Sequence, residues 1–164
     1  MITVIEKLDG TKINLLEKGI ITLSFDPGVV EIITESVEIP GRAGRINTRM
    51  DYGKRRAKLN IMVIADNIAD TRIKRDLVSS ILDGIEPYYI YESDVANMYD
   101  FELPGQKIGN YNFQNVTGAA DLTKKILWQR TDASSMVFNG LVGTRTISYE
   151  NFDSPFWNND PTLL

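Results

Sequence analysis

The succession of short strand-like segments restricts the fold more than any other feature of this sequence. Eight or more runs rich in β-branched and aromatic residues follow one another. Most of these runs are separated by turn residues and not by helical patterns. Strands joined by short turns pair antiparallel, because a parallel pair needs a long crossover connection. The pattern therefore predicts a mainly β (α+β) domain, an antiparallel β-sandwich or barrel with one packed α-helix and a β-hairpin extension.

The first two runs, Thr3–Leu8 and Thr11–Leu16, flank Asp9-Gly10, a dipeptide typical of a type I′ hairpin turn. Between the expected strands Ile46–Asp51 and Lys54–Ala65 we expect a break at Tyr52-Gly53. The other expected strands are Ile20–Phe25, Val29–Ile39, Ile46–Asp51, Lys54–Ala65, Tyr88–Tyr91, Tyr99–Leu103, Tyr111–Val116, Lys124–Arg130, Met136–Phe138 and Arg145–Tyr149.

The run from Lys54 shows the clearest alternation. Its second face turns apolar only at Met62 and Ile64, so we expect a strand that begins half-exposed and ends covered on both faces. The residues that share its apolar face are Ala57, Leu59, Ile61, Val63 and Ala65.

One segment has helical periodicity. Ala69, Ile73, Leu77 and Ile81 recur every four residues, with charged and small polar residues between them. Asp66 or Asp70 is a suitable N-cap for this helix, and Gly84 is suited to its C-terminal end.

Composition excludes several classes of function. The 164 residues include neither cysteine nor histidine, which rules out disulfides, thiolate zinc sites and Ser-His-Asp or Cys-His catalysis. We find no nucleotide-binding or nucleophile motif, and we expect no enzyme activity, cofactor or metal. No apolar run is long enough to cross a bilayer, and the N-terminus lacks the features of a secretory signal, so we expect synthesis in a cytoplasm.

A dense run of cations is the strongest candidate for a binding site. The formal net charge of −4 argues against a nucleic-acid module, so we interpret the run first as a subunit or partner interface. The alternative is a carbohydrate- or nucleic-acid-binding module. The candidate interface residues are Gly41, Arg42, Gly44, Arg45, Arg49, Lys54, Arg55, Arg56 and Lys58.

Other patterns have weaker functional interpretations. Gly41 and Gly44 form a GxxG like that of KH domains, but no helical pattern flanks it. Asn115-Val116-Thr117 is formally a glycosylation acceptor. The carboxylates at Glu31, Glu35 and Glu38 fit solvated strand faces, and the aromatic residues that could form a sugar platform are Tyr88, Tyr89, Tyr91 and Tyr99.

The order of several motifs resembles the N-terminal, ring-forming domain of siphophage distal tail proteins (the Dit family). The segments that carry the resemblance are the Pro-Gly-Arg-x-Gly turn in Glu38–Gly44, Tyr52–Arg56 before the long strand, the helix at about Asp70–Asp83, the Glu-Pro-aromatic step in Glu86–Ile90, the closing strand Ile147–Phe152 and the Asp-x-Pro-Phe-aromatic motif in Asp153–Trp157.

This resemblance implies a structural subunit of a phage tail tip or baseplate hub: a homo-hexameric ring around the DNA channel, which DNA only passes through. The implied neighbours are the tail tube protein, a tape-measure or tail-associated tip protein, and baseplate or receptor-binding proteins, with no membrane. The protein would be made in the host cytoplasm and reside in the virion tail tip. Residues 1–158 would be the ring-forming (belt) domain, and residues 159–164 a tail or the start of a linker to the galectin-like domain that family members usually carry.

Overall fold

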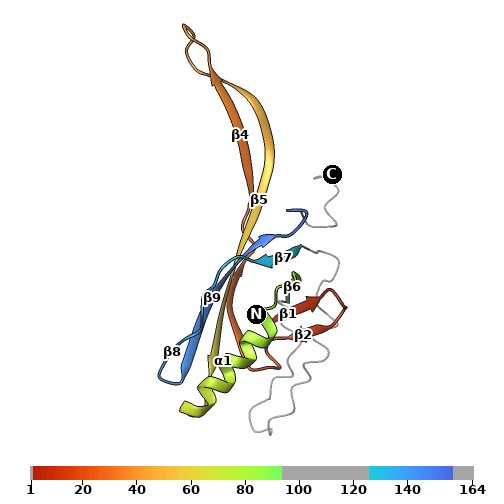
Figure 1. Ribbon diagram of the computed structural model, residues 1–164, viewed down its shortest axis with the longest axis vertical. Helices are drawn as coiled ribbons and strands as arrows, with labels where there is room; N and C mark the ends of the chain where they lie inside the picture. The colour runs from red at the N-terminus through yellow and green to blue at the C-terminus, as the bar shows by residue number, and fades with distance from the viewer. Residues whose placement is uncertain (1, 94–125, 157–164) are drawn as a thin grey trace, which may run out of the picture.

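The computed structural model describes residues 2–93 and 126–156, which form nine strands and one helix (Figure 1). The expected strands Tyr99–Leu103 and Tyr111–Val116, the Asn115-Val116-Thr117 triplet and residues 157–164 lie outside the described residues. The elements are β1 (Ile2–Lys7), β2 (Lys12–Asn14), β3 (Ile20–Asp26), β4 (Val30–Glu38), β5 (Arg45–Ile64), α1 (Ile68–Leu82), β6 (Tyr88–Ser93), β7 (Leu127–Arg130), β8 (Val137–Asn139) and β9 (Val142–Asn151).

The strands pair in one antiparallel sheet that is not closed. Its order is β2-β1-β6-β7-β9-β5-β3, with β4 paired to β5 and β8 paired to β9. Ile5 of β1 and Ile20 of β3 come from distant positions in this order but belong to the same core, so the sheet curls around its buried side chains. The predicted mainly β, antiparallel fold with one helix is confirmed.

Strand β5 is longer than the sequence indicates. The predicted break at Tyr52-Gly53 is wrong, because β5 continues through these two residues. The strand stays paired with β4 there through a register shift between Val30 and Ile32 of β4. Gly53 suits this irregularity, since a Cβ there would lie 3.1 Å from Ile33 and 3.2 Å from Glu31. One continuous strand therefore serves both the hairpin extension and the body.

The body half of β5 alternates as predicted. The five residues of its apolar face are all buried, namely Ala57, Leu59, Ile61, Val63 and Ala65. The expectation that the strand ends covered on both faces is wrong, because Ile64 is 53% exposed.

Helix α1 packs on the core through its C-terminal half. Val78, Ile81 and Leu82 are buried, whereas Ile73, which the periodicity assigns to the packed face, is 64% exposed. Asn67 caps the helix by accepting a hydrogen bond from the Asp70 amide at 2.8 Å, so neither predicted aspartate is the N-cap. The C-cap is Asp83, and Gly84 does not adopt positive φ.

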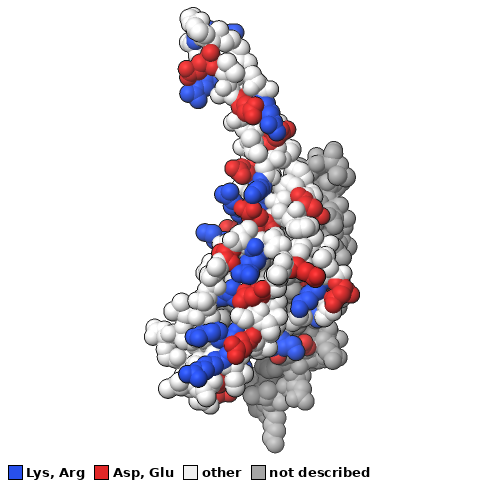
Figure 2. Space-filling view, in the orientation of Figure 1, with Lys and Arg blue, Asp and Glu red and all other residues white. Residues whose placement is uncertain are grey.

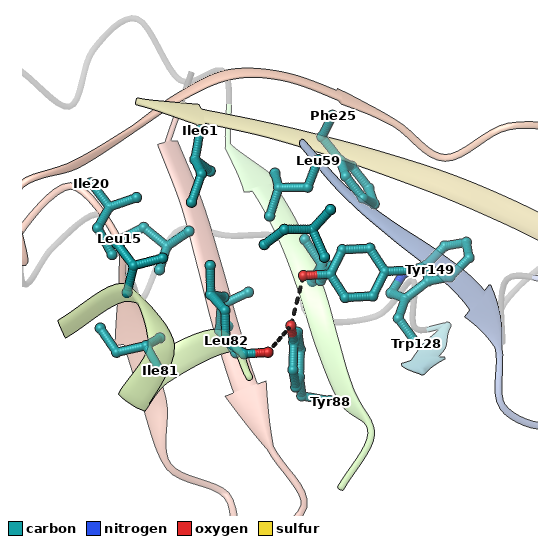
Figure 3. Close-up of a cluster of buried hydrophobic side chains, with 14 of the residues drawn as sticks. Leu15, Ile20, Phe25, Leu59, Ile61, Ile81, Leu82, Tyr88, Trp128 and Tyr149 are labelled. Atoms are coloured by element: carbon teal, nitrogen blue, oxygen red, sulfur yellow. Dashed lines mark hydrogen bonds between the residues drawn. The ribbon is translucent and has the colours of Figure 1, made fainter. Parts of the chain in front are cut away.

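The core contains large aromatic residues from four strands, namely Phe25 of β3, Tyr88 of β6, Trp128 of β7 and Tyr149 of β9 (Figure 3). Trp128 of β7 and Tyr149 of β9 are fully buried, and Phe25 meets the Trp128 ring edge-on with 6.1 Å between centroids. Ile126 and Ile147 are buried beside them, as the predicted alternation of these strands requires.

The first hairpin forms with a different turn from the predicted one. Gly10 has φ +88°, but no described residue other than glycine has positive φ, so Asp9 does not satisfy type I′ geometry. The Lys7 amide instead donates to the Thr11 carbonyl at 2.9 Å, which leaves a three-residue loop. The Asp9 carboxylate accepts from the Thr11 amide, a hydrogen bond that lowers the pKa of Asp9.

Candidate functional site

A two-stranded arm leaves the body of the molecule. It consists of β4, the turn at its tip and β5 as far as Tyr52, and Figure 1 shows it extending well beyond the rest of the sheet. Every residue of β4 after Val30, and every residue of β5 up to Tyr52, is exposed. An isolated two-stranded hairpin is marginally stable in water, so an arm of this kind needs a surface to pack on.

The tip of the arm is a glycine-dependent turn. Gly41 has φ +80° and Gly44 has φ +96°, values that L side chains rarely adopt. The Arg42 amide donates to the Ile39 carbonyl at 3.2 Å, and Arg42 is exposed. Because strands and not helices flank Gly41 and Gly44, this turn lacks the helix ends on which a KH-type phosphate clamp depends.

Carboxylates of the arm pair with its arginines. The register aligns Glu38 with Arg45, and Arg45 Nε lies 3.1 Å from Glu38 Oε1. Arg49 faces Glu35 at 3.4 Å and also contacts Asp51, a hydrogen bond that raises the pKa of Arg49. Figure 2 shows both signs of charge along the arm, which therefore presents no uniformly basic surface to nucleic acid.

The cations at the base of the arm are also held within the molecule. Lys54 Nζ lies 3.1 Å and Arg56 Nε 3.5 Å from the carboxylate of Glu150 in β9. Lys58 is exposed further along β5, opposite Asp26 and Ser148. The structure therefore divides the predicted basic stretch between the tip, the arm and the body.

Arg55 differs from the other cations because it binds backbone carbonyls. Its Nε donates to Pro27 O at 3.0 Å, Nη2 to Gly28 O at 3.0 Å and Nη1 to Pro155 O at 3.2 Å. The Arg55 amide donates to Asn151 Oδ1 at 2.7 Å. The side chain is half-buried, and burial lowers the pKa of the Arg55 guanidinium. This residue joins the end of β3 and the segment after β9 at the base of the arm.

Apolar side chains on the arm are exposed to an unusual degree. Ile32 and Tyr52 are register partners with 59% and 61% exposure, and Met50, which shares their face, is 64% exposed. Val37 and Ile46 form another exposed pair nearer the tip, on the opposite face of the ribbon. Exposed apolar patches occur at protein–protein contacts, at membrane contacts and in ligand-binding grooves.

Two of the aromatic residues considered for a sugar platform are inaccessible. Tyr88 and Tyr91 are buried, so their rings are not available to stack on a sugar. The Tyr91 hydroxyl donates to Glu6, and burial raises the pKa of Tyr91. Tyr99 lies outside the described residues. Within the two described ranges, no group of three or more acidic side chains could hold a metal ion, and α1 is neither long nor apolar enough to span a membrane.

Sequence reasoning missed the partners of the basic stretch. Glu35 and Glu38 were interpreted only as solvated carboxylates, and Glu150 was not considered. The signal for the first two is their mirrored spacing about the Pro40-Gly41 turn, which a hairpin register converts into cross-strand pairs. No local signal could identify Glu150, because it meets Lys54 only through the pairing of β5 with β9.

One comparison with known proteins identifies the family. Residues 8–123 match the model of the phage tail protein RIFT-related domain, and this range includes the whole arm and α1. No curated protein matches the sequence.

Among solved structures, the chain resembles the SPP1 Dit protein (gp 19.1), described as a paradigm of the hub adsorption apparatus in phages that infect Gram-positive bacteria, with a TM-score of 0.61 and 14% identity over 93% of this chain. It also resembles the phage p2 baseplate in its activated conformation, with TM-scores of 0.53 and 0.54 and 8% identity over 95% of this chain in the strontium and calcium forms. The chain spans about half the length of these proteins, 51% of the SPP1 chain and 45% of the p2 chain.

The family match covers most of the chain, and the shared fold confirms the predicted resemblance to siphophage distal tail proteins. The protein belongs to the phage tail protein RIFT-related domain family.

Proposed function

We propose that this chain is a subunit of a hexameric ring in a phage tail-tip hub, and that its arm packs against a neighbouring copy. The ring would join the tail tube to the distal tip proteins and surround the DNA channel. In this role the protein acts through its surfaces, without catalysis or a cofactor, and assembles in the host cytoplasm before it becomes part of the virion. The observation that carries the proposal is the projecting arm with exposed Ile32, Met50 and Tyr52.

A ring of identical subunits needs two different, complementary patches on each copy. The arm is one. The far end of the body offers a second apolar surface, where Ile64 of β5 pairs with Val142 of β9 and both are exposed. The start of α1 and the turn between β8 and β9 lie at the same end of the molecule (Figure 1), and Ile68 and Leu141 in these two segments are exposed. These two unlike surfaces support head-to-tail association.

The charge of the chain is compatible with a DNA channel. Each copy carries a formal net charge of −4, and the arm arginines Arg45 and Arg49 are paired with carboxylates. A ring of such subunits gives DNA little to bind while it passes. The tail tube, tape-measure or tip, and receptor-binding proteins are the proposed neighbours along the axis.

Light scattering coupled to size-exclusion chromatography tests the proposal. At increasing protein concentration we expect a species of six times the 18.5 kDa monomer mass, visible as rings by negative-stain microscopy. If the protein stays monomeric at millimolar concentration and also fails to enter tails when mixed with the tube protein, the proposal is wrong.

A further inference from the structure

We infer that Arg55 is a positioning residue that sets the angle at which the arm leaves the body, and that it ties this angle to the position of the segment Asn151–Phe156. The inference rests on the proposed function in one respect, since the arm is taken as the contact with a neighbouring copy. The geometry itself does not depend on any ring.

The contacts of Arg55 come from both sides of the arm base. Pro27 and Gly28, whose carbonyls accept from the guanidinium, lie between β3 and β4. Pro155, the third acceptor, belongs to the segment that follows β9. A guanidinium presents its N–H groups in a rigid planar fork, so three carbonyls bound to one fork are held in a fixed arrangement.

A second set of contacts joins the same elements. The Arg55 amide donates to Asn151 Oδ1 at 2.7 Å, and Asn151 Nδ2 donates to the Asp153 carbonyl at 2.9 Å. Above them, the ring of Tyr52 on the arm meets the ring of Phe156 edge-on, with 5.0 Å between centroids and 87° between planes. The arm and the segment are therefore connected at two levels, by hydrogen bonds at the base and by an aromatic pair further out.

The backbone at Gly28 leaves little room for another geometry. Gly28 has φ +63°, and a Cβ at this position would lie 2.1 Å from the carbonyl oxygen of Arg56. The Gly28 amide is held by Asp26 Oδ1 at 2.9 Å. Because the turn lies directly against β5 beside Arg55, a change in the arm angle must break contacts of Arg55. Movement of Asn151–Phe156 and movement of the arm are expected to accompany each other.

Distance measurement between two spin labels tests this inference. The chain contains no cysteine, so Arg42→Cys at the arm tip and Asp76→Cys on exposed α1 accept labels without side reactions. Labelled protein is diluted into an excess of unlabelled protein, so that only distances within one copy are recorded. We expect a single narrow distance distribution, which becomes about twofold wider when Arg55→Ala is added, since the arm then moves as a hinged element.

Three variants make the result specific. Arg55→Lys, with one ammonium in place of the fork, is expected to give an intermediate width. Arg49→Ala is the matched control, because the side-chain partners of Arg49 lie within the arm, and it should leave the distribution unchanged. Phe156→Ala removes the Tyr52 contact without touching the guanidinium and should also widen it.

A distribution of wild-type width in folded Arg55→Ala overturns the inference. If Arg55→Ala does not fold, as judged by circular dichroism, wild-type widths in both Phe156→Ala and Asn151→Ala overturn it instead. The ring assay is separate: a protein whose arm angle depends on Arg55 but which never forms rings contradicts the proposed function alone.

Discussion

The hydroxyl groups of Tyr88 and Tyr149 lie 2.6 Å apart in the core, although the two residues are 61 positions apart in the sequence. The Tyr88 hydroxyl donates to the carbonyl of Leu82 at 3.1 Å, so the Tyr149 hydroxyl is the donor between the two rings (Figure 3). This chain of hydrogen bonds connects β9 through β6 to the last turn of α1.

The direction of the chain makes the two hydroxyls unequal. Tyr88→Phe leaves both the Leu82 carbonyl without its donor and the Tyr149 hydroxyl without its acceptor, and we expect a loss of about 1–3 kcal/mol in the free energy of unfolding. Tyr149→Phe leaves the Tyr88–Leu82 hydrogen bond intact and should cost about 1 kcal/mol or less. Urea unfolding of the two variants measures both values. Equal losses would contradict the assigned donor.

Alkaline pH should destabilise the protein through the same pair. Burial raises the pKa of Tyr88 to about 12 and raises that of Tyr149 well above its usual value of 10.0. A phenol whose pKa is raised by folding keeps its full contribution to stability below its unfolded pKa and loses it as the pH rises towards the folded pKa. The free energy of unfolding should therefore be level up to about pH 10 and fall between about pH 10 and pH 12. Urea unfolding at these pH values provides the measurement. In the double variant Tyr88→Phe, Tyr149→Phe, the free energy of unfolding should fall less with pH than in the unaltered protein.

Self-association should depend on the apolar face of the arm. Met50→Asp places a charge on that face, and we expect it to raise the concentration needed for ring formation at least about tenfold. The melting temperature of the monomer should stay unchanged, because Met50 is exposed. Leu8→Asp is the control, since Leu8 is 53% exposed in the first hairpin, away from the arm. Light scattering over a concentration series provides the measurement, and an equal loss of association in both variants would remove the arm from the interface.

Nucleic-acid binding should be absent under ordinary ionic conditions. The arginines at positions 45 and 49 are paired with carboxylates, and Arg55 binds backbone carbonyls. We expect no retention on heparin at about 0.15 M salt, where a basic binding module is retained. Glu35→Gln combined with Glu38→Gln frees Arg45 and Arg49 and should produce weak, salt-sensitive retention. Strong retention of the unaltered protein would favour the nucleic-acid-binding alternative.

Gly28 should tolerate substitution far less than Gly84. Gly28 has positive φ, and a methyl group at this position would clash with the Arg56 carbonyl. Gly28→Ala should therefore lower the free energy of unfolding by about 2 kcal/mol or more. At Gly84 a Cβ would have open space and φ is not positive, so Gly84→Ala should change stability by less than about 1 kcal/mol. Thermal unfolding of both variants decides the matter. A similar melting temperature for the two would mean that the turn before β4 can relax.

Sequence patterns predicted those parts of the fold that local periodicity determines. The alternation around Leu59 gave the buried face of β5, and the four-residue spacing ending at Ile81 gave the helix. Periodicity shows which face of an element is apolar, but it does not show how far along the element the core extends. For this reason Ile73 was assigned to a buried face although the first half of α1 runs past the core, and Ile64 was expected to be covered.

The candidate interface stays a prediction, and its internal organisation was not predicted. The structure places the turn at Gly41 and Gly44, and the cations that follow it, on or near the arm. Their neutralisation depends on cross-strand register, and the role of Arg55 depends on Pro155, a residue 100 positions away. Contacts of such separation are products of the tertiary fold, and one sequence alone carries no pattern that reveals them.

Strand β5 crosses from the body into the arm without interruption, from Ile64 back to Arg45. Because successive side chains of a strand point to opposite sides, inserting one residue near Gly53 would leave the core intact and move the arm side chains of β5, but not those of β4, to the other side of the arm. Ile32 would keep its place while Met50 and Tyr52 moved, so the apolar face that these three residues share would be divided. The length of one strand, counted in single residues, thus fixes which side chains of the arm share a face.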